Sequence, residues 1–304
     1  MLMNAPITTT PVNSLKIWFM ALRPKTLTAA VGPMAMGTAM AAEAGAAHLP
    51  IALVCLFTAL MLQIGTNIAN DYYDYQKGAD SVDRLGPTRV TQAGLLAPAT
   101  VRLGFTVCFA LAALGWAVIT ARAGWLMVLA GAVSILSGIF YTAGPRALGY
   151  IGLGDLFVFV FFGPVAVAGC FYAQTLHLTP AVVLAGIGPG LLAVAILTVN
   201  NLRDIHSDRR SGKKTLAVRF GMGFARAEYV LAIIGAALIP PILLLFTPRH
   251  PGSLLASLVC LAALPVIRVI LTRHEGPALN RALGRTGALL LGYCVVFSVG
   301  WLWV

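Results

Sequence analysis

The feature that most constrains this chain is a series of long apolar stretches that together occupy most of its length. A helix needs about 20 predominantly apolar residues to cross the hydrocarbon layer of a bilayer. Only 10% of the residues are charged, against about 25% in a typical soluble domain, and the mean hydropathy is +0.87. The sequence therefore predicts an all-α, polytopic membrane protein. Nine stretches approach the required length, at residues 26–42, 50–70, 100–121, 124–142, 151–173, 181–202, 226–247, 252–272 and 286–304.

The stretches leave no room for a soluble domain, so we expect residues 1–304 to form a single membrane domain. Residues 1–15 are expected to be a disordered leader, because they lack the basic segment and apolar run of a signal peptide. The cysteines all lie in apolar stretches without paired spacing and are predicted to be small buried side chains, with no disulfide framework. They are Cys55, Cys108, Cys170, Cys260 and Cys294.

The positive charges are distributed unevenly between the two sides of this arrangement. With the N-terminus in the cytoplasm, every Lys and Arg except Arg122 and Arg249 falls in a cytoplasmic segment. Cytoplasmic loops of membrane proteins carry such an excess. The pattern predicts nine transmembrane helices with a cytoplasmic N-terminus. It also accounts for the net charge of +11, so the lipid bilayer is an expected partner and nucleic acid is not.

Six of the ten acidic residues fall in two clusters, each at the predicted cytoplasmic end of an apolar stretch. Residues three and four apart share one face of a helix. In both clusters an Asn precedes the first Asp by four residues, as in a degenerate internal repeat. We expect the two polar stripes to face each other across a central cavity. The first stripe consists of Asn67, Asn70, Asp71 and Asp74, and the second of Asn200, Asn201, Asp204 and Asp208.

Carboxylates on one helix face repel each other unless cations lie among them. Mg²⁺ prefers oxygen ligands and is typically held by one or two carboxylates together with substrate phosphates. Ionisable groups near membrane spans are also costly and tend to be functional. We therefore predict a site for two Mg²⁺ ions and a diphosphate. The basic residues expected to neutralise the diphosphate are Lys77, Arg84, Arg89, Lys213 and Lys214, although basic residues at helix ends are more commonly signals of topology.

A single acidic residue at a helix end is most commonly a solvated interfacial group, and we expect this of Glu43, Asp155, Glu228 and Glu275. A diphosphate at the mouth of an apolar bundle implies a lipid-like tail. If the diphosphate is allylic, its departure leaves a carbocation that water would quench, so the cavity should be dry. Candidate lining residues are Phe140, Tyr141, Tyr150, Phe157 and Phe159, although aromatic stripes in membrane helices also serve packing and interfacial roles.

Several segments resemble the UbiA superfamily of intramembrane prenyltransferases, most closely its 1,4-dihydroxy-2-naphthoate polyprenyltransferase branch. They are L22-R-P-K-T-L27, N70-D-Y-Y-D74, G86-P-T-R-V90, Y141-T-A-G-P-R146 and the long segment N200-N-L-R-D-I-H-S-D-R-R-S-G-K-K-T-L-A-V-R-F-G221. The acid that the commoner superfamily pattern places four residues after Asp74 is Gly78 here, and the next acid is Asp80. The resemblance implies a ring of helices around a cavity that opens laterally to lipid. It also implies the inner membrane of a bacterium and a site on the cytoplasmic side.

The resemblance further implies transfer of a polyprenyl group from polyprenyl diphosphate to 1,4-dihydroxy-2-naphthoate. CO₂ and diphosphate are lost, and demethylmenaquinone is formed for menaquinone biosynthesis. Asp71, Asp74, Asp204 and Asp208 are the implied catalytic residues. The implied metal ligands are these four with Asn67 and Asn70, and the implied substrate-binding residues are Arg23, Lys77, Arg84, Arg89, Tyr141, Arg146, Asn200, Lys213 and Lys214. Arg146 or Arg23 is the candidate to hold the acceptor carboxylate.

Two alternatives remain open at this point. A prenyltransferase for 4-hydroxybenzoate or another aromatic acceptor would keep the acids and change the acceptor pocket. A secondary transporter would place its ionisable groups near the bilayer midplane, whereas these acids lie at helix ends. The enzymatic hypothesis requires the two acid-bearing helix ends to meet on one side of the membrane.

Overall fold

The computed structural model describes residues 14–78 and 85–303, so Arg84 lies outside the described residues. All regular elements in these ranges are helices, and helix α1 begins inside the predicted leader, at Ser14. The α-helices are α1 Ser14–Leu22, α2 Pro24–Glu43, α3 Leu49–Gln76, α4 Pro98–Ala123, α5 Leu126–Phe140, α6 Gly154–Phe162, α7 Pro164–Thr175, α8 Pro180–Arg210, α9 Leu216–Phe246, α10 Leu255–Val259, α11 Leu264–Thr272 and α12 Gly276–Leu302. Two 3₁₀ turns, η1 Pro251–Leu254 and η2 Cys260–Ala263, flank α10.

The helices confirm the all-α membrane fold and overlap every predicted stretch. Within the described ranges, 7 helical segments are long and apolar enough to cross a membrane. Helix α5 is shorter, with 15 residues, and α2 has 20 residues but is not among the seven. The count of nine spans therefore stays a prediction.

Proline and hydroxyl side chains explain where many of these helices begin. Pro occupies the first or second position of α2, α3, α4, α7 and α8, where its missing N–H is not needed. Thr179 and Thr215 cap α8 and α9, accepting hydrogen bonds from the backbone N–H groups of Val182 and Val218.

The stretch at 151–173 is interrupted, because the chain breaks between α6 and α7 at Gly163 and Pro164. A Cβ atom at Gly163 would lie 2.6 Å from the carbonyl oxygen of Phe159 and 2.7 Å from that of Gly186 on α8. Only glycine permits this approach of two backbones. The break brings the α6–α7 junction against the first third of α8, at Gly186 and Gly190. The stretch at 252–272 is likewise irregular and consists of η1, α10, η2 and α11.

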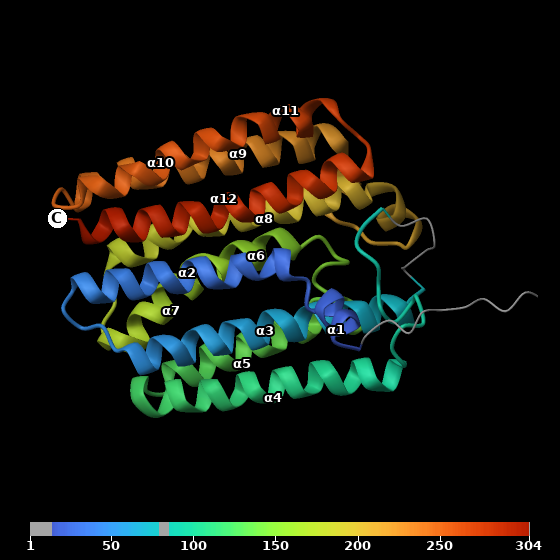
Figure 1. The fold of residues 1–304 in the computed structure, drawn as a ribbon, viewed down its shortest axis with the longest axis horizontal. Coiled ribbons are helices and arrows are strands. Elements are labelled where there is room, and N and C mark those ends of the chain that lie inside the picture. The colour runs from blue at the N-terminus through green and yellow to red at the C-terminus, as the bar shows by residue number, and fades with distance from the viewer. Residues whose placement is uncertain (1–13, 79–84, 304) are drawn as a thin grey trace, which may run out of the picture.

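The long helices run roughly alongside one another, with α8, α9 and α12 in one group and α3, α4 and α5 in another (Figure 1). Helix α2 packs against both α12 and α3 and so joins the groups. The helices form a ring around a cavity of about 330 Å³, which is lined by residues of α2 to α8 and of α12. The predicted ring with a central cavity is confirmed.

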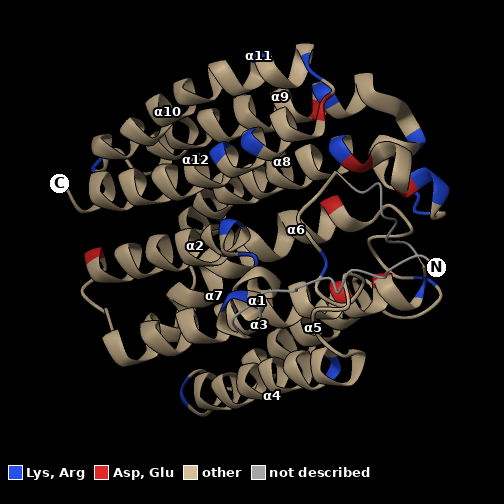
Figure 2. Cartoon of the chain, turned by 45° about the vertical axis from the view of Figure 1, so that its right-hand side comes forward, with Lys and Arg blue, Asp and Glu red and all other residues tan. Residues whose placement is uncertain are grey.

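The C-terminal ends of α3 and α8 lie at the same end of the bundle (Figure 1). Figure 2 shows a dense group of acidic and basic residues at that end and few charged residues at the other. The two acid clusters therefore share one end of the bundle, as the enzymatic hypothesis requires.

Candidate active site

One face of α3 lines the cavity along most of the helix. Its lining residues recur three and four positions apart, which keeps them on a single face. From the first to the last, the helix rises by about 28 Å, close to the roughly 30 Å thickness of a bilayer core. The cavity thus runs along the membrane-spanning length of α3. The lining residues are Cys55, Thr58, Ala59, Leu62, Gln63, Thr66, Asn67, Asn70 and Asp74.

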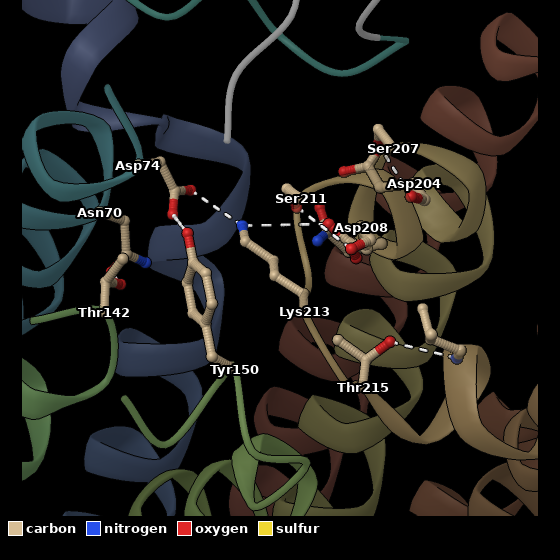
Figure 3. Close-up of polar contacts among 12 residues, drawn as sticks. Asn70, Asp74, Thr142, Tyr150, Asp204, Ser207, Asp208, Ser211, Lys213 and Thr215 are labelled. Atoms are coloured by element: carbon tan, nitrogen blue, oxygen red, sulfur yellow. Dashed lines mark hydrogen bonds and ion pairs between the residues drawn. The ribbon is translucent and has the colours of Figure 1, made fainter. Parts of the chain in front are cut away.

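Helix α8 contributes the opposite wall at the end of the cavity where the charged residues lie, which is its mouth. Its polar residues Asn200, Asn201, Asp204 and Asp208 all line the cavity. The ammonium group of Lys213 lies 3.1 Å from Asp74 Oδ2 on α3 and 3.9 Å from Asp208 Oδ1 on α8 (Figure 3). A single cation therefore bridges the two acid clusters, so the predicted half-sites face each other.

Asp74 is bonded by groups from three loops. Its Oδ2 accepts a hydrogen bond from Arg89 Nη2 at 2.8 Å and from Lys213 Nζ at 3.1 Å, and its Oδ1 accepts one from the Tyr150 hydroxyl at 2.7 Å. Asp74 and Arg89 are both buried. The Tyr150 ring also lies 4.1 Å from Lys77 Nζ and 4.8 Å from Lys213 Nζ, so two cations contact it. Asp74 thereby gathers the loops that surround the mouth.

Asp71 does not take part in the contacts around Asp74. Its Oδ2 accepts a hydrogen bond from the backbone N–H of Val90, and its Oδ1 accepts one from that of Thr91, both at 3.0 Å. The side chain is buried and is not among the cavity-lining residues. Asp71 thus holds the backbone that follows Arg89 and so positions Arg89 on Asp74. Its predicted role as a metal ligand stays a prediction.

Asp204 is bonded by its own neighbour in the sequence. Arg203 donates from Nη2 to Asp204 Oδ2 at 2.6 Å and from Nε to Oδ1 at 2.8 Å, and both side chains are buried. Arg203 also donates to Asn200 Oδ1 at 2.7 Å and to Asn280 Oδ1 of α12 at 2.8 Å. The bidentate pair fixes the carboxylate on the cavity wall.

The turn after α8 explains how Lys213 reaches the mouth. Gly212 adopts a φ of 76°, a left-handed conformation that favours glycine, and the N–H of Lys213 donates to the carbonyl oxygen of Asp208 at 2.9 Å. The turn directs the Lys213 side chain back over the end of α8. Lys214 is exposed and does not line the cavity.

Asn67 ties α3 to the junction of α1 and α2. Its Nδ2 donates to the carbonyl oxygen of Leu22 and to the Thr26 hydroxyl, both at 3.0 Å. Between them Arg23 lines the cavity in a left-handed conformation, with a φ of 52°. Non-glycine residues held in this region concentrate at functional sites. Asn70 accepts a hydrogen bond from the Thr142 hydroxyl and also lines the cavity.

The remaining candidate residues are divided between the mouth and the surface. Lys77 Nζ donates to the carbonyl oxygens of Thr142 at 2.5 Å and Gly144 at 3.0 Å, and burial lowers the pKa of this ammonium group. Tyr141 lines the cavity below these loops. Arg146 is exposed and is not among the lining residues, so the structure does not bring it to the cavity with Arg23.

The aromatic lining differs in part from the predicted set. Tyr141, Tyr150 and Phe157 line the cavity, whereas Phe140 is exposed and Phe159 is not among the lining residues. Additional aromatic residues at the cavity are Trp116, Phe161 and Phe162, and Phe161 stacks on Phe157 with ring centroids 5.9 Å apart. The helical spacing of Phe157 and Phe161 was available in the sequence as a signal for this pair.

Two other features depart from the sequence-based expectations. Asp155, expected to be a solvated interfacial group, is buried at the start of α6. The charge pattern assigns Arg203 only to a cytoplasmic segment, whereas the structure pairs it with Asp204. The sequence carries a signal for this pair, since Arg203 is the one Lys or Arg inside the N200–D208 segment and its side chain can reach its neighbour.

The mouth offers the kind of ligands that a magnesium ion uses. Within the described ranges, no three His, Cys, Asp or Glu residues are close enough together to hold one ion by themselves. The Asn67, Asn70, Asp74, Asp204 and Asp208 side chains nevertheless supply oxygen atoms from both walls of the cavity. Lys213 already places a positive charge between Asp74 and Asp208. The residues therefore fit a hard cation that is completed by phosphate oxygens from a substrate.

The UbiA prenyltransferase family model matches residues 30–303 of this chain. The chain belongs to the UbiA prenyltransferase family. It is 37% identical to the 1,4-dihydroxy-2-naphthoate octaprenyltransferase of Escherichia coli (strain K12), over 95% of this chain and 96% of that protein. It is also 37% identical to the protein of the same description from Mycobacterium tuberculosis (strain ATCC 25618 / H37Rv), over 92% of this chain and 95% of that protein.

The fold is also similar to that of a solved UbiA homologue from Archaeoglobus fulgidus, described as bound to DMAPP and Mg²⁺. The TM-score is 0.63 at 19% identity, over 93% of this chain and 99% of that one. This UbiA family member is accordingly a polytopic membrane prenyltransferase, and the transporter alternative is set aside.

Proposed function

We propose that the chain, as a single membrane domain, transfers a polyprenyl group from polyprenyl diphosphate to 1,4-dihydroxy-2-naphthoate. Diphosphate and CO₂ leave, and demethylmenaquinone is the product, a step of menaquinone biosynthesis. The observation that carries the proposal is the 37% identity to naphthoate octaprenyltransferases over nearly the whole chain. The facing acid clusters at the mouth of an apolar cavity support the same reaction.

Basic residues at the mouth would bind the diphosphate. Arg89 and Lys213 both contact Asp74, and the ammonium group of Lys77 lies 4.1 Å from the Tyr150 ring, whose hydroxyl bonds the same carboxylate. Asn67, Asn70, Asp74, Asp204 and Asp208 would hold two Mg²⁺ ions together with the phosphate oxygens, and Asp71 stands beside them as a further candidate. When bound, the ions would offset the negative charge that develops on the departing diphosphate.

The apolar cavity would take the prenyl tail and exclude water. The long face of α3 offers a groove about as deep as the bilayer core is thick. The stacked Phe157 and Phe161 rings present aromatic surface to it. Aromatic faces attract positive charge, so these rings would stabilise a cationic prenyl carbon while water is kept away.

Arg23 would hold the carboxylate of the acceptor. It lines the cavity at the same level as Asn67, whereas Arg146 is exposed. Attack by the ring carbon that bears the carboxylate lets CO₂ leave in place of a proton, so no strong base is needed at that carbon. We expect Arg23→Ala to raise the KM for the acceptor about tenfold, and Arg146→Ala to change it less than twofold.

An assay of the purified protein with both acceptors tests the assignment. Radiolabelled polyprenyl diphosphate should be transferred to dihydroxynaphthoate and not to 4-hydroxybenzoate. Turnover of hydroxybenzoate alone would reject the naphthoate assignment and leave the prenyl transfer intact. EDTA should stop turnover, and added Mg²⁺ should restore it; full activity in excess EDTA would reject the metal site.

We further propose a bacterial inner-membrane location with the N-terminus and the active site on the cytoplasmic side. The gathering of charged residues at the mouth supports this orientation (Figure 2). A cysteine introduced at the exposed Lys214 should react with a membrane-impermeant thiol reagent from the cytoplasmic side of sealed vesicles. Labelling from the other side alone would reverse the orientation.

A further inference from the structure

Three polar side chains line the cavity below the mouth without a protein partner. Gln63 and Thr66 lie on the cavity face of α3, and Ser137 lies on α5. Within the part of the chain that the structure describes, none of these three side chains forms a hydrogen bond. Together these three side chains form a polar band.

The two helices meet at the polar band. A Cβ atom built on Gly138 of α5 would lie 2.7 Å from the Thr66 hydroxyl oxygen, so Thr66 rests against the residue next to Ser137. Gln63 precedes Thr66 by three residues and therefore shares its face of α3. The polar band thus draws on neighbouring positions of α3 and α5, and all its members open to the same cavity.

Helical hydroxyl groups nearby are satisfied within their own helix. Ser134, one turn before Ser137, donates to the carbonyl oxygen of Ala130 at 2.7 Å, and Thr58 on α3 donates to that of Val54 at 2.7 Å. Thr66 and Ser137 make no such bond. Because an unsatisfied polar group within a bilayer costs several kcal/mol, polar side chains left open at this depth indicate a polar ligand.

The prenyl tail does not meet this requirement, because an isoprenoid chain has no hydrogen-bonding group. The deepest member on α3 also lies below the proposed diphosphate site. Gln63 is about 16 Å from the level of Asp74, where Arg89 and Lys213 gather, and about 6 Å below Asn67, the deepest of the proposed Mg²⁺ ligands, whereas Thr66 lies close to the level of Asn67. The remaining ligand is the acceptor ring, which carries two hydroxyl groups and must lie just below the diphosphate.

We propose that Gln63, Thr66 and Ser137 bind the ring hydroxyl of the acceptor that is remote from its carboxylate. This inference rests on the proposed naphthoate function. The carboxylate is attracted to the cations at the mouth, with Arg23 on the cavity wall, so the hydroxyl on the far side of the ring points deeper. There the Gln63 amide can accept from it and donate to it, with the two protein hydroxyl groups completing the subsite.

Two acceptors that differ by this one hydroxyl group test the proposal. The full-length protein in lipid nanodiscs is assayed with 1,4-dihydroxy-2-naphthoate as substrate and 1-hydroxy-2-naphthoate as competitor. The wild type should bind the dihydroxy compound about tenfold better, because a site built to bond a hydroxyl group discriminates against the analogue that lacks it. Gln63→Leu should raise the KM for the dihydroxy compound about tenfold and leave the Ki of the competitor within twofold.

Matched variants separate this role from a structural one. Ser137→Ala should weaken binding of the dihydroxy compound about threefold. Ser134→Ala, which removes a hydroxyl already bonded to its own helix, should behave as the wild type. In all three variants the KM for polyprenyl diphosphate should stay within twofold, and gel filtration should show the same monodisperse protein.

Each contrary outcome has a distinct meaning. If Gln63→Leu and Ser137→Ala weaken both acceptors equally, or raise the KM for polyprenyl diphosphate instead, the subsite is rejected while the proposed function stands. If the wild type transfers the prenyl group to 4-hydroxybenzoate and not to the naphthoate, both the function and the subsite are rejected.

Discussion

The acid clusters of α3 and α8 share their spacing but are held in different ways. On α3, Asp74 is bonded by Tyr150 and Lys213, which lie 76 and 139 residues away in the sequence. On α8, Asp204 is bonded by the adjacent Arg203, and Asp208 lies near Lys213 of the following turn. The α3 cluster therefore organises distant loops, whereas the α8 cluster is fixed largely by its own surroundings. The two similar half-sites thus differ in role: the α3 half-site assembles loops from elsewhere in the chain, and the α8 half-site anchors its own carboxylates.

The largest expected effect comes from removing the first acid of either cluster. Asp71→Ala and Asp204→Ala should each lower turnover at least about 10³-fold, equivalent to about 4 kcal/mol in the barrier. Prenyl transfer in nanodiscs measures this loss. Near-normal turnover in either variant would contradict the site.

Hydrogen exchange then distinguishes the two clusters. In Asp71→Ala, the amides of Val90 and Thr91 lose their acceptor and should exchange at least about tenfold faster, whereas Asp204→Ala should leave them unchanged. Equal acceleration of amide exchange in both variants would show that the α3 and α8 clusters do not differ in how they hold the loops.

The next effect concerns the arginine partners. Arg203→Leu removes the bonds to both oxygens of the buried Asp204 and should lower the free energy of unfolding by about 3–5 kcal/mol. Arg89→Leu should cost less, because Tyr150 and Lys213 still bond Asp74. Thermal unfolding in detergent compares the two variants, and a lower Tm for Arg89→Leu would reverse the order.

A smaller effect is expected from the lysine that joins the clusters. Lys213→Met should raise the KM for polyprenyl diphosphate about tenfold, since one charge-assisted contact is lost. Lys214→Met is the matched control, because its side chain is exposed, and should change this KM less than twofold. Equal effects of the two substitutions would show that the basic loop as a whole attracts the diphosphate, and that Lys213 makes no specific contact with it.

The smallest effect is expected at Tyr150. Tyr150→Phe keeps the ring that Lys77 and Lys213 contact and removes one of three bonds to Asp74. One hydrogen bond contributes about 0.5–1.5 kcal/mol, so turnover should fall about two- to tenfold. A loss as large as that of Asp71→Ala would show that the hydroxyl group takes part in the reaction itself.

Much of the fold could be predicted from the sequence, because apolar length and helical spacing are local properties. The stripe from Asn67 to Asp74 indicated which face of α3 meets the cavity, and three of its four residues do. Asp71 shows the limit of that reasoning. Its spacing places it at the edge of the stripe, and there the loop after Arg89 docks on it. Such docking depends on a loop outside the helix, 19 and 20 residues further along the chain, and the periodicity of the helix carries no information about it.

The break in the 151–173 stretch shows a different limit. A Gly-Pro pair stood in the apolar run, and Pro favours the first turn of a helix. Hydropathy alone did not distinguish one long helix from two short ones. The decisive factor is the close approach of Gly163 to Gly186 on α8, which appears only when both helices are in place.

The long groove of α3 bears on how the product leaves. In the proposed function the reacting end and the prenyl tail lie along this one helix face, so the quinone precursor would be assembled upright, with its ring nearer the mouth and its chain parallel to the lipid acyl chains. Departure would then need a sideways step into the bilayer and no passage of the hydrocarbon through water. A longer or shorter isoprenoid would change only the contacts at the far end of the groove, and the contacts at the bond-forming end would stay the same.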